Sequence, residues 1–119
     1  MARITVFGIA NCDTVKRARA WLDEQDLAYE FHDFQKAGVP LPGLDDWLAA
    51  VGWQTLLNRK GTTWRKLSDA QREAAHDAAS ARALMLAQPS VIKRPVLQWP
   101  GGAITVGFNP AEWADRLED

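Results

Sequence analysis

The sequence predicts a single α/β domain in which a β-α-β unit and a β-β-α unit flank a helical segment. Three observations support this prediction. Residues 3–34 have the pattern strand, helix, strand; residues 39–88 carry only helix signals; and residues 95–119 hold two short strands followed by a capped helix. A chain of 119 residues is long enough for one hydrophobic core and too short for two independent ones.

The N-terminal unit begins with RITVFG (Arg3 to Gly8), where β-branched and aromatic residues ending in glycine predict a buried strand. Small or apolar residues then recur on one helical face between Asp13 and Gln25, which predicts a helix. The alternating segment AYEFHDF (Ala28 to Phe34) predicts a second strand. Because crossovers of this kind are right-handed, the two strands are expected to be parallel.

The middle of the chain is predicted to be helical throughout. Residues Leu44 to Val51 form a short amphipathic pattern, and a helical turn is expected at Gln54 to Asn58 within a connection punctuated by glycines. Further on, Ser68 followed by Gln71 three residues later fits a capping box at the start of another helix.

The rest of the insert and the C-terminal unit follow from turn and cap signals. Ser80 is expected to start a helix that stops at Pro89. The segments PVLQW (Pro95 to Trp99) and AITVG (Ala103 to Gly107), with Pro-Gly-Gly between them, predict a β-hairpin. The last helix has Asn109 at its cap position and proline at its first helical position.

This order of elements predicts a thioredoxin-like fold: four strands with helices on both faces and a helical insertion between the second and third strands. The thioredoxin-like part is expected to comprise about residues 1–38 and 89–119, and the insertion about residues 39–88.

The composition excludes several classes of protein. Fourteen basic and 15 acidic residues give a net charge of −1, without the basic excess that nucleic acids or anionic membranes require. The N-terminal apolar run is too short for a signal peptide or a membrane span. A single cysteine allows no internal disulfide. We therefore expect a cytoplasmic monomer that binds neither nucleic acid nor membrane.

Cys12 is the chemically interesting residue of the first unit, because it lies between the first strand and the first helix. At a helix N-terminus, the free N–H groups of Asp13, Thr14 and Val15 would favour the reactive thiolate. Lys16 and Arg17, one turn on, would add to this effect, whereas the Asp13 carboxylate opposes it. The alternative is a buried, inert thiol, the usual fate of a lone cysteine.

The Arg94-Pro95 pair precedes the third predicted strand. A cis peptide bond, found in about 5% of X-Pro cases, would turn the backbone of Arg94 toward the Cys12 loop and let it pair with an extended peptide-like thiol. The guanidinium could then hold a carboxylate or an oxyanion near the sulfur. On the residues alone, a trans proline with solvated Lys93 and Arg94 side chains is the favoured alternative.

A third stretch, LLNRKGTTWRKL, concentrates basic residues, among them Arg59 and Lys60, around a glycine. Such a loop can bind an anion, although a solvated loop packed through Trp64 is favoured on the residues alone. His32 and His76 lack the spacing of zinc ligands, so we expect no metal site.

Taken together, NCDTVKRARAWL, GTTWRKL, DAASA and IKRP resemble the arsenate reductase (ArsC)/Spx-like family of thioredoxin-fold proteins, most closely its YffB branch. The resemblance covers essentially the whole chain. It implies a cis peptide before Pro95 and a cysteine, matching Cys12, that attacks arsenate and then forms a mixed disulfide with glutathione. It also implies that arginines matching Arg59 and Arg94 bind the oxyanion.

The sequence departs from the family pattern at two places. Arsenate reductases of the family carry a further arginine where this chain has Gly107 or Phe108, and a lost charge-assisted contact costs about 1.5–3 kcal/mol. Spx-type regulators typically have a Cys-x-x-Cys pair, whereas Val15 stands at the second position here.

The expected function is therefore that of a glutathione-dependent thiol–disulfide oxidoreductase with one nucleophile, Cys12, and no bound cofactor. Glutathione, as co-substrate, would resolve the mixed disulfide, since the chain has no second cysteine. The residues expected to bind it are Asn11, Asp13, Thr14, Arg59 or Lys60, Arg94 and Pro95.

Expected partners, besides glutathione, are a glutaredoxin or a disulfide-bearing protein. Two alternatives are a weak arsenate reductase linked to glutathione and glutaredoxin, and a non-enzymatic regulator that binds a protein as Spx does.

Overall fold

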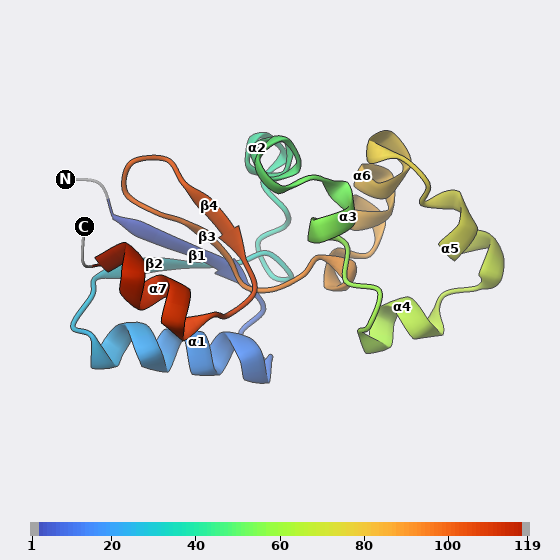
Figure 1. The fold of residues 1–119 in the computed structure, drawn as a ribbon. Helices are drawn as coiled ribbons and strands as arrows, with labels where there is room; N and C mark the ends of the chain where they lie inside the picture. The colour runs from blue at the N-terminus through green and yellow to red at the C-terminus, as the bar shows by residue number, and fades with distance from the viewer. Residues whose placement is uncertain (1–2, 118–119) are drawn as a thin grey trace.

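A four-stranded sheet with strand order β2-β1-β3-β4 forms the centre of the computed structural model, which describes residues 3–117 (Figure 1). The strands are β1 (Ile4–Gly8), β2 (Tyr29–Asp33), β3 (Val96–Gln98) and β4 (Ile104–Val106). β1 pairs with β2 in parallel, as predicted, and β3 pairs antiparallel with both β1 and β4. The element order β-α-β, helical insert, β-β-α agrees with the sequence prediction.

Side chains of β1 alternate between two hydrophobic cores, one on each face of the sheet. Ile4 and Val6 belong to the core beneath α1 (Asp13–Glu24) and α7 (Pro110–Leu117), whereas Phe7 belongs to the core beneath the insert. Burial on both faces explains why the strand reads as a nearly continuous apolar run rather than a polar–apolar alternation.

The face covered by α1 and α7 is closed by aromatic rings around Trp113, which is almost fully buried. The rings of Trp21, Trp99 and Phe108 meet it edge-on, with centroids 5.6, 5.4 and 5.0 Å away. Edge-to-face packing of this kind is favourable because the positive ring edge faces the negative ring centre. Three of the six tryptophans are therefore explained by packing in this core.

The insert comprises five helices, α2 (Leu41–Val51), α3 (Trp53–Leu56), α4 (Thr62–Lys66), α5 (Asp69–Ala74) and α6 (Ala78–Ala87), and the 3-10 helix η1 (Pro89–Val91) follows it. Of these, α2 lies over the second face of the sheet (Figure 1), where the buried Trp47 packs 4.9 Å from Phe7 and 6.5 Å from Phe34, measured between ring centroids. The other helices extend away from the sheet, which gives the molecule its elongated shape of 44 × 26 × 26 Å.

The insert differs from the prediction in three places. α2 starts at Leu41 rather than Leu44, since prolines fit the first turn of a helix. Thr62–Lys66 forms a helix where a connection was expected. The cap of α6 is Asp77, and Ser80 is its capping-box partner three residues on, not the start of the helix. The predicted capping box of Ser68 with Gln71 is confirmed.

One short antiparallel contact joins the middle of the insert, after α3, to the segment that follows the insert. Leu57 and Ile92 form a β-bridge, with the Asn58 N–H donating to the Val91 carbonyl (2.8 Å) and the Lys93 N–H to the Leu56 carbonyl (2.7 Å). This contact fixes the position of Asn58 relative to the segment that leads into β3. Within residues 3–117, no helix combines the length and the apolar character needed to cross a membrane.

Close packing of α1 on β1 depends on Gly8, where an added Cβ would lie 2.9 Å from Cγ2 of Val15. We expect Gly8→Ala to lower the free energy of unfolding by about 1–3 kcal/mol, as overpacking of a core usually does. Val15→Ala alone should also destabilise, by leaving a cavity. The double variant should lose less free energy of unfolding than the two single variants lose together, because alanine at position 15 makes room for the new Cβ at position 8. Urea denaturation measures all three, and strict additivity would contradict the contact.

Candidate active site

Cys12 is the N-cap residue of α1, with extended backbone angles (φ −141°, ψ 122°), and its carbonyl accepts the first helical hydrogen bond from the Lys16 N–H (2.9 Å). The side chain is half-buried and free of any disulfide. This is the position expected from the strand-loop-helix pattern of the sequence. The sulfur makes no regular capping hydrogen bond, so the N–H groups of the first turn act on it as nearby partial positive charges.

The loop that carries Cys12 is tied to β2 through Asp33. One carboxylate oxygen, Oδ2, accepts the Ala10 N–H (3.1 Å), and the other accepts the N–H groups of Gln35 and Lys36 (3.0 and 3.2 Å). Desolvation raises the pKa of Asp33, but these three N–H groups and the Lys36 charge lower it by more. The net pKa therefore lies below its usual value. Asp33 falls within the second strand predicted from the sequence and was not predicted as a site residue, although an aspartate at a strand end is typical of such turns.

Arg94 approaches the sulfur from the segment that precedes β3. Its Nη1 donates to the Ser90 carbonyl (2.7 Å) and, at 3.4 Å, to the Ile92 carbonyl, which fixes the guanidinium plane. Its Nε is buried and, within residues 3–117, has no hydrogen-bond partner. The peptide bond between Arg94 and Pro95 is cis.

The surroundings of Cys12 favour the thiolate. Partial burial raises the pKa of the thiol, but the Val15 N–H, the Arg94 guanidinium and the Thr14 N–H together lower it more, so the net pKa lies below its ordinary value. A lowered pKa together with partial exposure is typical of reactive cysteines and not of structural ones. The inert-thiol alternative is therefore disfavoured by the geometry.

A hollow of about 220 Å³ opens beside the sulfur, and no acidic side chain is among its lining residues: Cys12, Thr14, Asn58, Lys93, Arg94, Gly107 and Phe108. Two cations, Lys93 and Arg94, therefore face a cysteine whose thiolate is favoured. Such a site suits a ligand that brings both a sulfur, or another electrophilic atom, and a negative charge.

The other predicted binding residues lie at different distances from this hollow. Thr14 lines it, whereas Asn11 and Asp13 are exposed and do not. Arg59 and Lys60 line a second hollow of about 410 Å³. The structure thus does not bring Arg59 or Lys60 to the sulfur itself.

The two hollows share part of their walls. Asn58 and Lys93 line both, so the second hollow adjoins the first. The Arg59 guanidinium carbon lies 5.4 Å from the centre of the Trp53 ring, a cation–π contact that holds the side chain against the insert.

Lys93 and Asn58 were not predicted as site residues. A Cβ added to Gly107 would lie 3.3 Å from Cε and 3.9 Å from Nζ of Lys93, and Gly107 has a positive φ of 84°. The lysine therefore stands over Gly107, one of the two positions, with Phe108, at which the family resemblance implies a further arginine. The only sequence signal for a role of Lys93 in the site is its position next to Arg94, because the contact of Lys93 with Gly107 depends on the folded hairpin.

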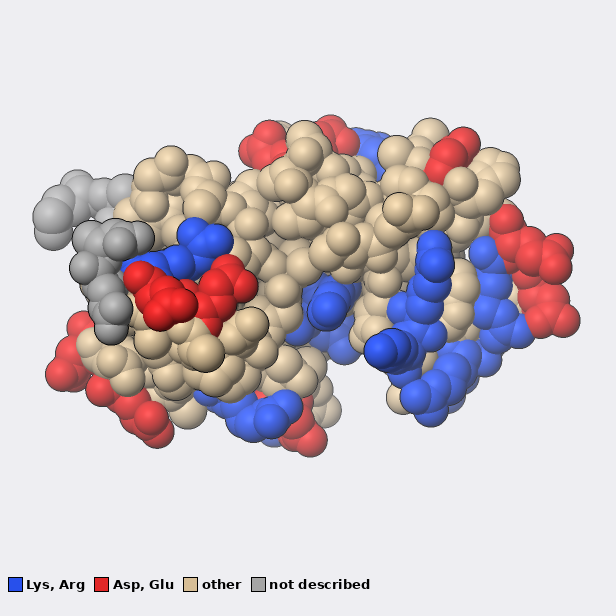
Figure 2. Space-filling model, viewed as in Figure 1, with Lys and Arg blue, Asp and Glu red and all other residues tan. Residues whose placement is uncertain are grey.

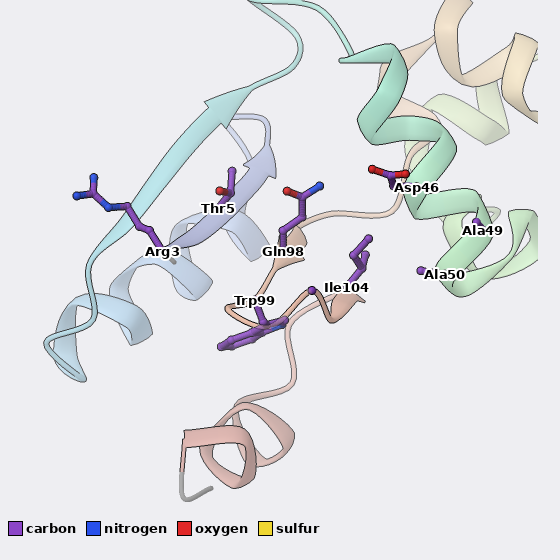
Figure 3. A pocket seen from close by; sticks show the side chains of 9 residues that line it. Arg3, Thr5, Asp46, Ala49, Ala50, Gln98, Trp99 and Ile104 are labelled. Atoms are coloured by element: carbon purple, nitrogen blue, oxygen red, sulfur yellow. The ribbon is translucent and has the colours of Figure 1, made fainter. Parts of the chain in front are cut away.

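A larger hollow of about 560 Å³ lies at the opposite end of β1, between the sheet and α2 (Figure 3). Thr5, Gln98 and Ile104 form its sheet side and Asp46 its helix side, while Arg3 points away from the others toward Glu30, 3.6 Å distant. It holds no cysteine or histidine, and the chemistry of the Cys12 hollow has no counterpart there. Across residues 3–117, no group of three or more His, Cys, Asp and Glu side chains is placed to hold a metal ion.

The chain matches a known protein family and a full-length relative. The family model described as the ArsC family matches residues 7–116. The chain belongs to the ArsC family. An uncharacterized protein of Haemophilus influenzae is 39% identical to this ArsC-family chain over 110 residues, which are 92% of this chain and 95% of that protein.

Two solved structures are similar to this ArsC-family chain over nearly their whole length. A protein named YffB is 54% identical, with a TM-score of 0.86, and the match covers 94% of this chain and 96% of that one. An arsenate reductase (ArsC) related protein from Brucella melitensis is 49% identical, with a TM-score of 0.75 and coverage of 99% and 97%. The family predicted from the sequence motifs is confirmed, and so is the thioredoxin-like α/β fold with its helical insertion.

We expect Arg94→Met to raise the pKa of Cys12, because the guanidinium charge that favours the thiolate is removed while burial remains. The pH profile of iodoacetamide alkylation, which follows the thiolate fraction, should shift to higher pH. Arg94→Lys keeps a positive charge and should shift it less. Arg116→Met, which removes a cation from the far end of α7, should leave the profile unchanged. An unaltered profile in Arg94→Met would show that the guanidinium does not act on the sulfur.

Proposed function

We propose that this protein is a glutathione-dependent thiol–disulfide oxidoreductase with Cys12 as its nucleophile. The observation that supports this most directly is the pairing of Cys12, at the N-terminus of α1, with the Arg94 guanidinium, which helps to lower the thiol pKa. Membership of the ArsC family supports an oxidoreductase in general terms. The choice of glutathione rests on the size and charge of the adjoining hollows and on the absence of a second cysteine.

The reaction proceeds by two exchanges of disulfide bonds. The Cys12 thiolate attacks the glutathione sulfur of a mixed disulfide, forming a Cys12–glutathione bond and releasing the substrate thiolate, which takes a proton from water. A second glutathione thiolate then attacks the glutathione sulfur on Cys12. Oxidised glutathione leaves, and the Cys12 thiolate is regenerated. The chain has one cysteine, so the second thiol must come from outside.

Glutathione would lie across both hollows. Arg94 and Lys93 would face its carboxylate nearest the sulfur, and Arg59 or Lys60 would reach the carboxylate at its other end through the shared wall. The Pro95 carbonyl already accepts the Gly107 N–H (2.9 Å). Of the two carbonyls that flank the cis bond, we therefore assign that of Arg94 to the cysteinyl N–H of glutathione.

Incubation with oxidised glutathione should add one glutathionyl group to the wild-type chain, on Cys12, and none to Cys12→Ser; intact-mass spectrometry measures both. At neutral pH, Arg94→Met should react about ten- to a hundredfold more slowly, since a charge-assisted contact is worth about 1.5–3 kcal/mol. Arg116→Met serves as the matched control and should react as the wild type does. A wild-type chain that takes up no glutathione would refute the proposed function.

Arsenate reduction is the second candidate activity. It is favoured by two cations beside the sulfur and by the 49%-identical arsenate reductase related protein from Brucella melitensis. It is disfavoured at Gly107, where the backbone has a positive φ and the Lys93 side chain takes the place of an arginine. Arsenate would be bound by fewer guanidinium groups than in family members with the further arginine.

With arsenate, glutathione and a glutaredoxin present, we expect slow arsenate-dependent oxidation of glutathione. The oxidised glutathione is measured by coupling its formation to glutathione reductase. Arg94→Ala should abolish this oxidation, because among residues 3–117 Arg94 is the only arginine that lines the Cys12 hollow. Cys12→Ser gives the background rate. A wild-type rate equal to that background would eliminate this candidate and leave the thiol–disulfide activity unaffected.

A further inference from the structure

Positive charge is concentrated on one side of the molecule, although the net charge is only −1. Between Asp46 and Asp69 the sequence has no acidic residue and four basic ones. Figure 2 shows Lys and Arg gathered over α4 and α5 and in the notch between the insert and the part that holds α1. Asp and Glu lie over α2, at the outer edge of α5, and at the opposite end of the molecule, where Lys and Arg lie among them (Figure 2).

These cations follow one another outward from the active site along the insert. Lys93 lines the Cys12 hollow and, with Arg59 and Lys60, the adjoining one. Arg65 of α4 then reaches back, its Nη2 donating to the Lys60 carbonyl (2.7 Å). The Arg72 Nη1 donates in turn to the Arg65 carbonyl (3.2 Å). We call this set the cationic strip: Arg94, Lys93, Arg59, Lys60, Arg65 and Arg72.

Little of this charge is neutralised within the part of the chain that the structure describes. Arg72 pairs with Asp69, three residues before it in α5, and among residues 3–117 no other member of the cationic strip has a carboxylate within 4.0 Å. The hydrogen bonds to the Lys60 and Arg65 carbonyls hold the two arginines in place without reducing their charge. The strip is therefore a positioned, largely uncompensated positive surface.

The strip is longer than glutathione needs. Glutathione, a tripeptide with two carboxylates, would bind in the two hollows alone. Arg65 and Arg72 line neither of them. A ligand that uses these two arginines as well must extend further along the insert and carry more negative charge. An acidic polypeptide segment meets both conditions.

Building on the proposed function, we propose that the cationic strip docks the acidic flank of a glutathionylated protein, placing its mixed disulfide over Cys12. Electrostatic complementarity of this kind acts mainly on the rate of encounter and on the choice of partner. The strip would therefore select which proteins Cys12 acts upon, whereas Arg94 and the hollows bind the glutathione part. The partner's thiol is the leaving group of the first exchange described above.

A single-stranded nucleic acid is the less favoured occupant. Such ligands are bound by aromatic rings on which bases stack, next to a positive groove. Along the strip the neighbouring ring is that of Trp53, and the Arg59 guanidinium lies over it. Trp64 is half-buried and packs against the hydrophobic core.

The test uses three synthetic peptides that differ only in the residues around one glutathionylated cysteine: glutamates, glutamines or lysines. The measured quantity is kcat/KM for removal of glutathione, with reduced glutathione as the second thiol. We expect the glutamate peptide to exceed the glutamine peptide by about fivefold or more at low salt, and the difference to shrink as salt is added. In Arg65→Gln/Arg72→Gln, the preference should fall to about twofold or less, while the reaction of Cys12 with oxidised glutathione is unchanged.

Arg65→Lys/Arg72→Lys keeps both charges but loses the guanidinium geometry, so it should retain the preference if charge is what matters. Arg3→Gln/Arg116→Gln removes two cations elsewhere and should also retain it. Equal rates for the three peptides, or a preference that survives Arg65→Gln/Arg72→Gln, would overturn the proposal while leaving glutathione transfer intact. Competition by an oligothymidylate but not by polyglutamate would assign the strip to nucleic acid instead, and would also overturn it.

Discussion

The antiparallel pairing of β1 with β3 is the contact on which the site depends. Phe7 lies opposite Val96 in this pair, so the residues that follow β1 and those that precede β3 emerge at the same edge of the sheet. Cys12 comes from the first group and Arg94 from the second, although they are far apart in the sequence. A few ladder hydrogen bonds therefore create the ion-pairing geometry that favours the thiolate.

The insert is joined to the same edge by the bridge between Leu57 and Ile92. Through this bridge the insert contributes Asn58 to the hollow at the sulfur and brings Arg59 and Lys60 to the hollow next to it. The thioredoxin-like part thus supplies Cys12 and the guanidinium that lowers its pKa, and the insert supplies the charged surface around them. In the proposed function this division would separate the chemistry at Cys12 from the selection of a partner, because the insert can change its surface without moving Cys12.

Local patterns in the sequence predicted the strands, the capping box of Ser68 and the position of Cys12 at a helix N-terminus, because each depends on residues a few positions apart. The sequence did not predict what depends on chain segments meeting in space. Asp33 holds the Cys12 loop from another strand, and Lys93 stands over Gly107 only after the hairpin has formed. Arg59 follows the motif of the family yet lies in the neighbouring hollow, since its side chain packs on Trp53.

The left-handed backbone at Gly107, with the Lys93 ammonium above it, limits how this site can evolve. A side chain at that position would meet an unfavourable φ and, at the same time, the lysine methylene at 3.3 Å. Gain of an arginine there is therefore expected to be harmful as a single step and tolerated only after Lys93 and the local turn have changed. Mutational paths between a thiol-exchange site and an oxyanion-reducing site would then pass through both positions in a preferred order.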